Sequence, residues 1–198
     1  MITKFGQIKK TQLDAYGNPR KGGIIGLALD KGDELIGVEM TDGNQELLIG
    51  TRQGKAIKFS EAKVRKMGRA AHGVRGISLA KKDEVIGMVV ARKDTAILTV
   101  TALGFAKRTT AEEYRLTSRG GKGIINIKVT SKNGEAISLK TVSDNDELMV
   151  ITQNGVFLRC AVKDIRTTGR SSQGVRLIKI EDKDHVSCIA SVIAEEEE

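Results

Sequence analysis

Residues 113–129 read Glu113-Tyr114-Arg115-Leu116-Thr117-Ser118-Arg119-Gly120-Gly121-Lys122-Gly123-Ile124-Ile125-Asn126-Ile127-Lys128-Val129. A basic, glycine-rich loop, residues 119–123, leads here directly into a strand-like alternation of apolar and polar residues. Because glycine has no Cβ, such a loop lets the backbone approach an anion closely, and Arg119 and Lys122 add positive charge at the same place. We therefore interpret this unit as a candidate phosphate-binding element whose direction is fixed by the strand that follows.

Two glycine landmarks of this unit recur along the chain with a period of about 50 residues. Tight turns between two apolar, β-rich runs end in Gly6, Gly54, Gly104 and Gly155. A second glycine opens an apolar strand at Gly23, Gly73, Gly123 and Gly174. A three-residue loop that ends in glycine between two such runs is typical of a β-hairpin. Each repeat thus predicts strand, tight turn, strand, basic loop, strand, turn and strand.

The repeats favour an all-β fold, a propeller-like disc of about four blades, each with four antiparallel strands. We expect one domain over residues 1–194, with repeats at about 1–50, 51–101, 102–152 and 153–194, and an acidic tail at 195–198. Single helical turns are expected at residues 60–64 and 111–114, but no segment has the apolar periodicity of a long helix. The last repeat is predicted to lack its final strand.

Composition narrows the possible functions. The 198 residues carry a net charge of +8, and without the four terminal glutamates the charge rises to +12, which indicates a polyanionic partner. Aromatic residues are only 3% of the chain, so a stacking surface for single-stranded nucleic acid is not expected. The two cysteines, Cys160 and Cys188, are expected to be reduced and buried. No signal peptide or membrane-length apolar segment occurs, so we expect a cytoplasmic protein.

Catalytic, cofactor and metal sites are not predicted. The two histidines, His72 and His185, have no second ligand at metal spacing, and no P-loop motif is present. Tyr114 follows two glutamates, but we expect its ring to pack over the loop rather than to act as a nucleophile.

Basic residues recur in register when the repeats are aligned. Four residues after the hairpin glycine, the first column contains Lys10, Lys58, Arg108 and Arg159. Three or four residues before the second glycine, the second column contains Arg20, Arg69, Arg119 and Arg170. Around an axis, each column would become a ring of charges on one rim. The predicted DNA-binding set adds to these columns Lys21, Arg115, Gly120, Gly121, Lys122 and Gly123.

Other basic residues nearby, including Arg65 and Arg166, are each interpreted as ordinary solvated charges. The pattern favours wrapping of duplex DNA over reading of its bases. Each neutralised phosphate releases counterions, so many contacts made together can offset the cost of bending DNA, about 1–6 kcal/mol for a 20–30 bp site. No recognition helix for the major groove is apparent, so weak sequence preference is expected.

Several of these segments resemble one known family, the C-terminal domain of the DNA gyrase A subunit. The resemblance covers essentially the whole chain and is carried by Asn18-Pro19-Arg20-Lys21-Gly22-Gly23-Ile24-Ile25, Gly73-Val74-Arg75-Gly76-Ile77, Arg119-Gly120-Gly121-Lys122-Gly123, Ile151-Thr152-Gln153-Asn154-Gly155 and Gln173-Gly174-Val175-Arg176-Leu177-Ile178. It implies a β-pinwheel whose blades exchange strands and whose basic rim wraps DNA. It further implies a non-catalytic part of a bacterial, ATP-dependent type IIA topoisomerase that introduces negative supercoils. The implied partners are nucleoid DNA, the gyrase B subunit, which completes the holoenzyme, and the rest of the gyrase A chain; the isolated domain is expected to be a monomer.

The chain departs from the family pattern in two ways. The family domain usually has six blades, whereas four repeats occur here. The family's box, Gln-Arg-Arg-Gly-Gly-Lys-Gly, is matched only in its last five positions, by residues 119–123. The acidic end resembles a family tail that tunes wrapping. Two alternatives remain open: the related domain of topoisomerase IV, which wraps DNA less, and a propeller that serves as a protein-interaction scaffold.

Overall fold

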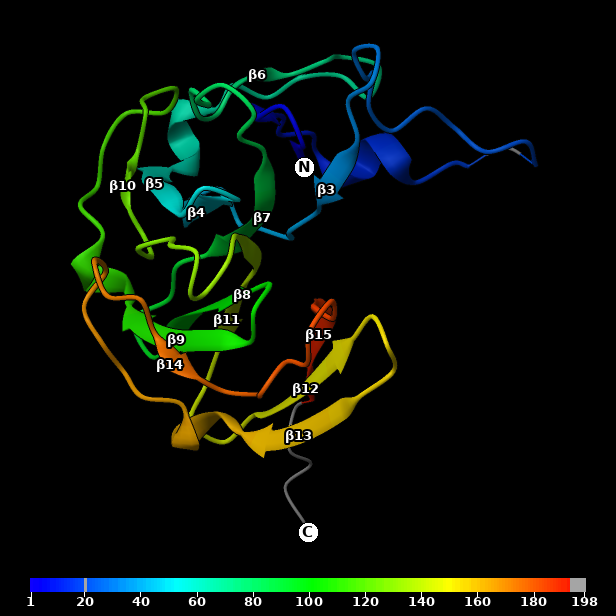
Figure 1. The fold of residues 1–198 in the computed structure, drawn as a ribbon. Helices are drawn as coiled ribbons and strands as arrows, with labels where there is room; N and C mark the ends of the chain where they lie inside the picture. The colour runs from blue at the N-terminus through cyan, green and yellow to red at the C-terminus, as the bar shows by residue number, and fades with distance from the viewer. Residues whose placement is uncertain (20, 193–198) are drawn as a thin grey trace, which may run out of the picture.

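The computed structural model describes residues 1–19 and 21–192, and it is built almost entirely from short antiparallel strands (Figure 1). The strands are β1 (Ile2–Thr3), β2 (Gln7–Ile8), β3 (Leu35–Gly37), β4 (Glu46–Thr51), β5 (Lys55–Ser60), β6 (Val74–Arg75), β7 (Val85–Val90), β8 (Ala96–Thr101), β9 (Phe105–Thr110), β10 (Ile124–Ile125), β11 (Ala136–Val142), β12 (Glu147–Thr152), β13 (Phe157–Ala161), β14 (Val175–Arg176) and β15 (Val186–Val192). Four 3-10 turns interrupt them: η1 (Leu13–Tyr16), η2 (Glu61–Lys63), η3 (Ala111–Glu113) and η4 (Val162–Asp164). The predicted all-β class is confirmed, and η2 and η3 lie where single helical turns were expected.

Four sheets follow one another around an arc, and neighbouring sheets exchange strands (Figure 1). Their strand orders are β3-β1-β2-β6, β10-β5-β4-β7, β11-β8-β9-β14 and β13-β12-β15. We call these sheets blades 1 to 4. The strands β6, β10 and β14, which we call exchange strands, each leave their own repeat to pair with the preceding blade. The last three repeat windows expected from the sequence begin at residues 51, 102 and 153, at the hairpin turns inside blades 2, 3 and 4, so each blade draws its strands from more than one window.

The fourth blade has three strands in the described part of the chain. The last predicted repeat, residues 153–194, contains β13, β14 and β15, and among the described residues no counterpart of β4, β8 or β12 follows β15, as expected. Within the fourth blade, β15 pairs with β12 over Glu147 to Thr152. The position without a strand is the one beside β13, which an exchange strand fills in the other three blades.

The hairpin turns form because their glycines take a left-handed conformation. Gly6, Gly54, Gly104 and Gly155 have φ values of 82°, 77°, 76° and 85°, which other residues rarely adopt. Each glycine N–H donates back to the threonine three residues earlier, at 2.9–3.1 Å, which closes the turn. The predicted hairpins are confirmed at all four positions.

Apolar side chains pack between successive blades rather than within a single sheet. Ile2 and Ile8 of blade 1 join Ile49 and Phe59 of blade 2 in one core cluster. A second cluster joins blades 2 and 3, and a third joins blades 3 and 4. The central strands β4 and β8 are buried on both faces, because neighbouring blades cover them on either side. The packing therefore fixes the order of the blades around the arc.

Candidate nucleic-acid interface

Strand exchange places each basic loop against the blade that precedes it. After a hairpin, the chain makes a 3-10 turn, crosses over and runs alongside the second hairpin strand of the previous blade. Parallel bridges mark this contact at Lys10↔Lys66, Lys58↔Leu116 and Arg108↔Thr167. The side chains of the first column therefore meet the backbone of the next repeat.

Lys58 of the first column is buried by this crossing. Its Nζ donates a 3.0 Å hydrogen bond to the Ala111 carbonyl of the next repeat and lies 3.1 Å from a carboxylate oxygen of Glu46. Only 8% of the residue is exposed. Its charge is paired inside the protein, so its surroundings disfavour the predicted contact with DNA phosphates.

Arg108 repeats the arrangement between blades 3 and 4. Its Nε donates to the Ile165 carbonyl at 2.6 Å, its Nη2 donates to the Lys163 carbonyl at 3.2 Å, and its Nη1 pairs with Asp144. The guanidinium, buried in the blade, ties η4 to β9. Only 7% of the residue is exposed, so its surroundings disfavour the predicted phosphate contact here too.

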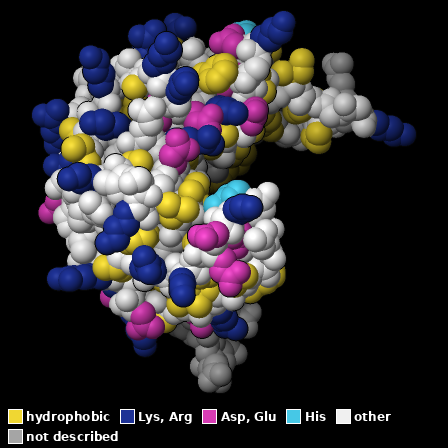
Figure 2. Space-filling view, in the orientation of Figure 1, with side chains coloured by type: hydrophobic (Ala, Val, Ile, Leu, Met, Phe, Trp, Pro, Cys, Tyr) yellow, Lys and Arg dark blue, Asp and Glu magenta, His cyan; other side chains and the backbone are white. Residues whose placement is uncertain are grey.

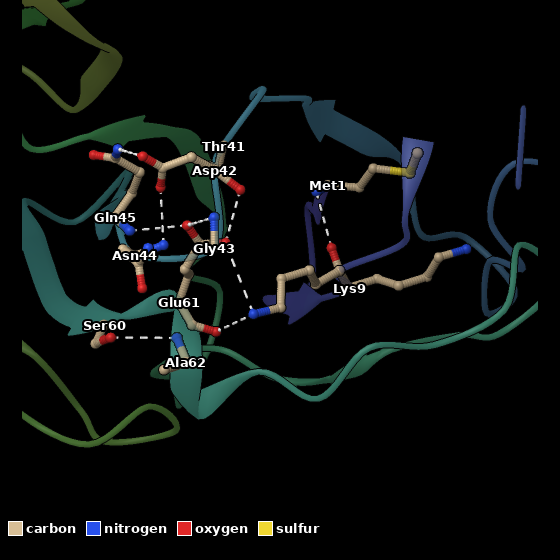
Figure 3. A network of polar contacts seen from close by, with 11 residues as sticks. Met1, Lys9, Thr41, Asp42, Gly43, Asn44, Gln45, Ser60, Glu61 and Ala62 are labelled. Atoms are coloured by element: carbon tan, nitrogen blue, oxygen red, sulfur yellow. Dashed lines mark hydrogen bonds and ion pairs between the residues drawn. The ribbon is translucent and has the colours of Figure 1, made fainter. Parts of the chain in front are cut away.

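Lys10 contacts Glu61 of the next repeat, and Figure 3 shows the polar cluster around Glu61. Its Nζ lies 2.9 Å from the Glu61 carbonyl and 3.8 Å from the Glu61 carboxylate. That carboxylate is buried and also accepts hydrogen bonds from the Thr41 hydroxyl and the Gly43 and Gln45 amides, at 2.7–3.0 Å. The cluster joins blade 1 to the segment that leads into β4.

Arg159, the last member of the first column, is exposed on β13 and pairs with Glu147 of the neighbouring strand. The Glu147 carboxylate raises the pKa of the guanidinium. Each of the four first-column cations therefore has a carboxylate partner, which gives the column a structural role within and between blades.

Arginines of the second column form hydrogen bonds that connect one repeat to the preceding one. Arg69, Arg119 and Arg170 each donate through Nη1 to a backbone carbonyl one repeat earlier, at 2.8–3.0 Å. The accepting carbonyls are those of Ile25, Arg75 and Ile125. All three arginines are partly exposed, so they remain candidates for phosphate contact. Arg20 lies outside the described residues, and its neighbour Lys21 is exposed.

The Arg119–Gly123 loop packs against the second repeat. The Gly120 amide donates to the Gly76 carbonyl at 2.6 Å. A Cβ on Gly123 would lie 2.6 Å from the Ala56 carbonyl oxygen, so this glycine is required by strand packing. Gly120 has a φ of 82° but would meet no atom closer than 3.6 Å. Gly121 and Lys122 are exposed in the same loop.

A shallow pocket of about 250 Å³ lies beside this loop. Arg115, Ser118, Gly121, Lys122 and the edge of Lys58 line it. The cationic groups of Arg115 and Lys122 are exposed, so the pocket combines open positive charge with a backbone that no Cβ obstructs at Gly121. This combination of donors suits a phosphate group.

A third set of arginines is exposed at one position that recurs in the last three repeats. We call Arg65, Arg115 and Arg166 the outer arginine column; each stands eleven residues after a hairpin glycine. The preceding residues, Val64, Tyr114 and Ile165, are each only 1% exposed. Because neighbouring residues of an extended segment point to opposite sides, burial of these three directs the arginines outward. Within residues 1–19 and 21–192, no carboxylate pairs with any of the three.

Sequence reasoning included Arg115 but treated Arg65 and Arg166 as ordinary surface charges. The missed signal was the eleven-residue spacing from the hairpin glycine, combined with the apolar residue just before. Figure 2 shows Lys and Arg side chains spread along the curved outer side, on the left of the view, whereas most visible carboxylates lie nearer the centre and the open side. The outer side is thus the more basic one in this view.

Tyr114 anchors the extended segment that carries Arg115. Its hydroxyl donates a 2.5 Å hydrogen bond to Asn126 Oδ1, and the Asn126 amide donates to Thr99 at 3.0 Å. Burial raises the pKa of the Tyr114 hydroxyl well above its usual value. A neutral, buried phenol fits the expected packing role.

Two buried lysines stand behind the second column. Lys107 Nζ donates to the carbonyls of Gly169 and Arg170, at 2.9 and 2.6 Å. Burial, and then the nearby Arg170 guanidinium, lower the pKa of Lys107 to about 8. Lys9 makes the equivalent contact with the Arg69 carbonyl, and burial likewise lowers its pKa. The two amines hold the backbone of the loops that carry the second column.

Membrane-spanning helices and metal clusters are both absent from the described residues. No helix among them is long and apolar enough to cross a membrane. No cluster of three or more His, Cys, Asp or Glu side chains that could hold a metal ion occurs in that part of the chain.

Comparison with known proteins shows which family shares this sequence. The family described as DNA gyrase C-terminal domain, beta-propeller, matches residues 1–42, 45–92, 95–143 and 146–192. The A subunit of DNA gyrase from Halalkalibacterium halodurans is 59% identical over the whole chain, and that from Brachyspira hyodysenteriae is 53% identical. The chain spans 24% of the length of each of these relatives.

Solved structures share the fold. The structure of a DNA gyrase A C-terminal domain superposes with a TM-score of 0.86 at 22% identity, covering 97% of this chain and 64% of the other. The crystal structure of a topoisomerase IV C-terminal domain superposes with a TM-score of 0.90 at 28% identity, covering 97% of this chain and 60% of the other. The propeller-like architecture is therefore common to both kinds of domain.

Proposed function

Since this chain belongs to the DNA gyrase C-terminal domain, beta-propeller family, we propose that it binds duplex DNA through phosphates and bends it along the outer rim. The single observation that carries the proposal is the outer arginine column, which repeats one exposed, uncompensated guanidinium in each of the last three repeats. Regularly spaced cations on a convex edge can neutralise phosphates in succession, and each contact releases counterions. Together they offset the energy of bending.

The proposed contact surface consists of the outer column, the second column and the pocket beside the glycine loop. Arg115 and Lys122 line that pocket. Lys10, Lys58 and Arg108 are left out, because each pairs with a carboxylate and donates to a backbone carbonyl of the next repeat. Arg159 also pairs with a carboxylate, but it is exposed and is therefore kept. The described residues include no long helix that could enter the major groove, so we expect contacts with the backbone rather than with bases.

Within a larger protein, we propose that the domain presents a bent DNA segment to the remaining parts of gyrase, its A and B chains, on the chromosome in the bacterial cytoplasm. The catalytic steps of ATP-driven negative supercoiling would then belong to other parts of the enzyme. The gyrase family model matches along the chain and gyrase A relatives are 53% and 59% identical to it, so gyrase is favoured over topoisomerase IV. No observation favours a protein-interaction scaffold.

The test replaces the outer column by Arg65→Gln, Arg115→Gln and Arg166→Gln together. Affinity for a duplex of roughly 30 bp is measured against salt, and bending is measured by energy transfer between dyes at the duplex ends. Loss of three phosphate contacts should lower the slope of log affinity against log salt by about 2.7. Energy transfer at saturating protein should fall with it.

The matched control removes the same net charge elsewhere, by Lys31→Gln, Lys81→Gln and Lys132→Gln. These exposed lysines lie in the turns before β3, β7 and β11. The control should change the slope and the bending far less than the outer-column variant. Equal losses in the two triple variants would show that binding follows net charge alone and would refute the proposed rim.

A further inference from the structure

Each of the first three blades has two exposed side chains on its outer edge, which we call its edge positions. One stands on the segment that crosses over from the next repeat, where it is bridged to the first column: Lys66, Leu116 and Thr167. The other stands on the exchange strand, where it pairs with the second hairpin strand: Arg75, Ile125 and Arg176. All six residues are exposed. Because strand pairing sets both positions, they can be compared from blade to blade.

Blade 2 differs from both of its neighbours at the edge positions. Blade 1 carries two cations there, and blade 3 carries a threonine and an arginine, whereas blade 2 carries Leu116 and Ile125. These two aliphatic residues are 54% and 41% exposed, and neither belongs to a core cluster of the described residues. Packing within the chain therefore does not account for them, whereas a contact with another molecule would.

Cations surround this apolar pair. Ile125 pairs with the exposed Lys55, and Arg170 donates to the Ile125 carbonyl at 2.8 Å. The exposed Arg115 directly precedes Leu116. In the described part of the chain, no carboxylate forms an ion pair with Lys55, Arg115 or Arg170. An apolar protein surface on this edge would desolvate three uncompensated charges, which is costly, whereas a polyanion would neutralise them.

The spacing of the pair fits the minor groove of duplex DNA. Leu116 is bridged to Lys58 and Ile125 pairs with Lys55, so the two lie three residues apart along β5, or about 10 Å. The minor groove is about 6 Å wide and has a sugar–phosphate strand on each side. Two side chains at this spacing can each meet the sugars of one strand, while the cations beside them meet its phosphates. The strands that border the major groove, about 12 Å wide, are too far apart for both contacts.

The exchange strand β10 lies on the convex side of the arc between β6 and β14, so DNA that follows the rim from blade 1 to blade 3 crosses blade 2 (Figure 1). We propose that the minor groove faces blade 2 at this crossing, and that Leu116 and Ile125 pack against the sugars of its two strands. Bending DNA around a protein narrows the groove that faces inward, and apolar contacts with both of its walls stabilise that narrowing. The inference rests on the proposed function and adds to it the groove that blade 2 recognises.

Disulfide tethering to DNA tests the groove. The background carries Cys160→Ser and Cys188→Ser, because both cysteines are free and Cys188, contrary to the expectation of burial, is exposed. An Ile125→Cys chain is mixed with a duplex that carries one central tethered thiol, either on a guanine N2 amino group in the minor groove or on a cytosine N4 amino group in the major groove. The minor-groove thiol should form the disulfide-linked complex. No linkage in the minor groove, or as much linkage in the major groove, would overturn the proposal.

The matched control is Met40→Cys in the same background. Met40 is 66% exposed, but it follows β3, the strand of blade 1 that lies farthest from the exchange strand β6. It should link to neither duplex. Linkage as efficient as that of Ile125→Cys would show that any exposed thiol reaches the tether, and the assignment of blade 2 to the minor groove would fail.

The salt dependence of affinity separates apolar contacts from ionic ones. Leu116→Ala combined with Ile125→Ala should weaken binding about tenfold at every salt concentration and leave the slope of log affinity against log salt unchanged, because apolar contacts release no counterions. Leu116→Lys combined with Ile125→Arg copies the edge of blade 1 and should steepen the slope by about 1.8, since two phosphate contacts are added. An unchanged slope in this second variant would show that DNA does not cross the edge of blade 2.

Failure of this inference can be told apart from failure of the proposed function. A parent chain whose DNA binding does not depend on salt would refute the proposed function and this inference with it. A parent that binds with a steep salt dependence, together with an alanine variant that binds and bends DNA as the parent does, would refute this inference alone.

Discussion

Arg108 and Arg115 belong to the same repeat and carry the same guanidinium, yet their surroundings differ completely. Arg108 is buried against two carbonyls of the next repeat and paired with Asp144, whereas Arg115 is exposed beside a small pocket. Both recur with the period of the blades. The difference teaches that a periodic basic column marks a repeated environment, and that the environment decides whether the charge is structural or free to bind.

The largest expected effect is the loss of stability when the buried Arg108 is replaced. Arg108→Met removes the donors to the Ile165 and Lys163 carbonyls and leaves the Ile165 carbonyl, which lies in a buried contact, without this partner. The free energy of unfolding, measured by urea denaturation, should fall by about 3 kcal/mol. Arg115→Met is the control and should change it by less than about 0.5 kcal/mol.

The same two variants should rank in the opposite order for DNA affinity. At a temperature where both are folded, Arg108→Met should bind duplex DNA like the parent, and Arg115→Met should bind more weakly. If Arg108→Met lost affinity while keeping its stability, the side chain would have to reach DNA, and the structural interpretation of the first column would fail.

Local chemistry explains why the hairpins, and the strands after the second glycines, could be predicted from sequence. A left-handed glycine at Gly54 or Gly104 is required by the turn itself, so its spacing alone reveals the blade period. The strand after Gly123 could be expected for the same reason. Family resemblance then supplied the strand exchange, which the spacing of residues does not reveal.

Whether a basic side chain is buried or exposed could not be predicted in most cases, because contacts with a neighbouring repeat determine it. Lys58 is buried by Ala111, which lies 53 residues later in the chain. Lys107 reads as a surface cation in the sequence but is fully buried beneath the loop of the next repeat. By contrast, Arg65 could have been assigned to the surface, because the apolar Val64 before it has to turn inward. Alternation of apolar and basic residues therefore predicts exposure locally, whereas burial by a neighbouring repeat cannot be predicted from it.

A second, smaller effect is the difference in stability between substitutions of two glycines in the same basic loop. Gly123→Ala would place a Cβ 2.6 Å from the Ala56 carbonyl oxygen at a φ of 70°, so strain and clash combine. Thermal or urea unfolding should show a loss of about 2–3 kcal/mol. Gly120→Ala carries only the left-handed strain and should cost about 1 kcal/mol.

DNA binding by the folded glycine variants then distinguishes packing from anion approach. If the loop glycines serve packing, both variants should keep the parent's affinity once folded. If Gly120→Ala instead bound DNA more weakly, although it loses less stability than Gly123→Ala, the backbone of this loop would have to contact a phosphate.

The last effect concerns the amine of Lys107, and it is measured through the pH dependence of stability. Its pKa is about 8 in the folded chain, against about 10.5 when unfolded, because burial disfavours the charged form. Between these values the unfolded state binds more protons, so the stability of the parent should rise with pH. Below pH 8 both states are protonated, and the cost of burying the charge is fully present. Lys107→Ile copies the residue at the same position of blade 2, Ile57, and removes this titration.

The measurement is the difference in unfolding free energy between the parent and Lys107→Ile, so that groups common to both chains cancel. From pH 7.5 to 9.5 the parent should gain about 2 kcal/mol relative to the variant. Arg170 is the nearest like charge and Glu113 the opposing one, so both chains retain them unchanged. A difference independent of pH would mean that Lys107 keeps its ordinary pKa, and that the carbonyls of Gly169 and Arg170 compensate fully for burial of the ammonium.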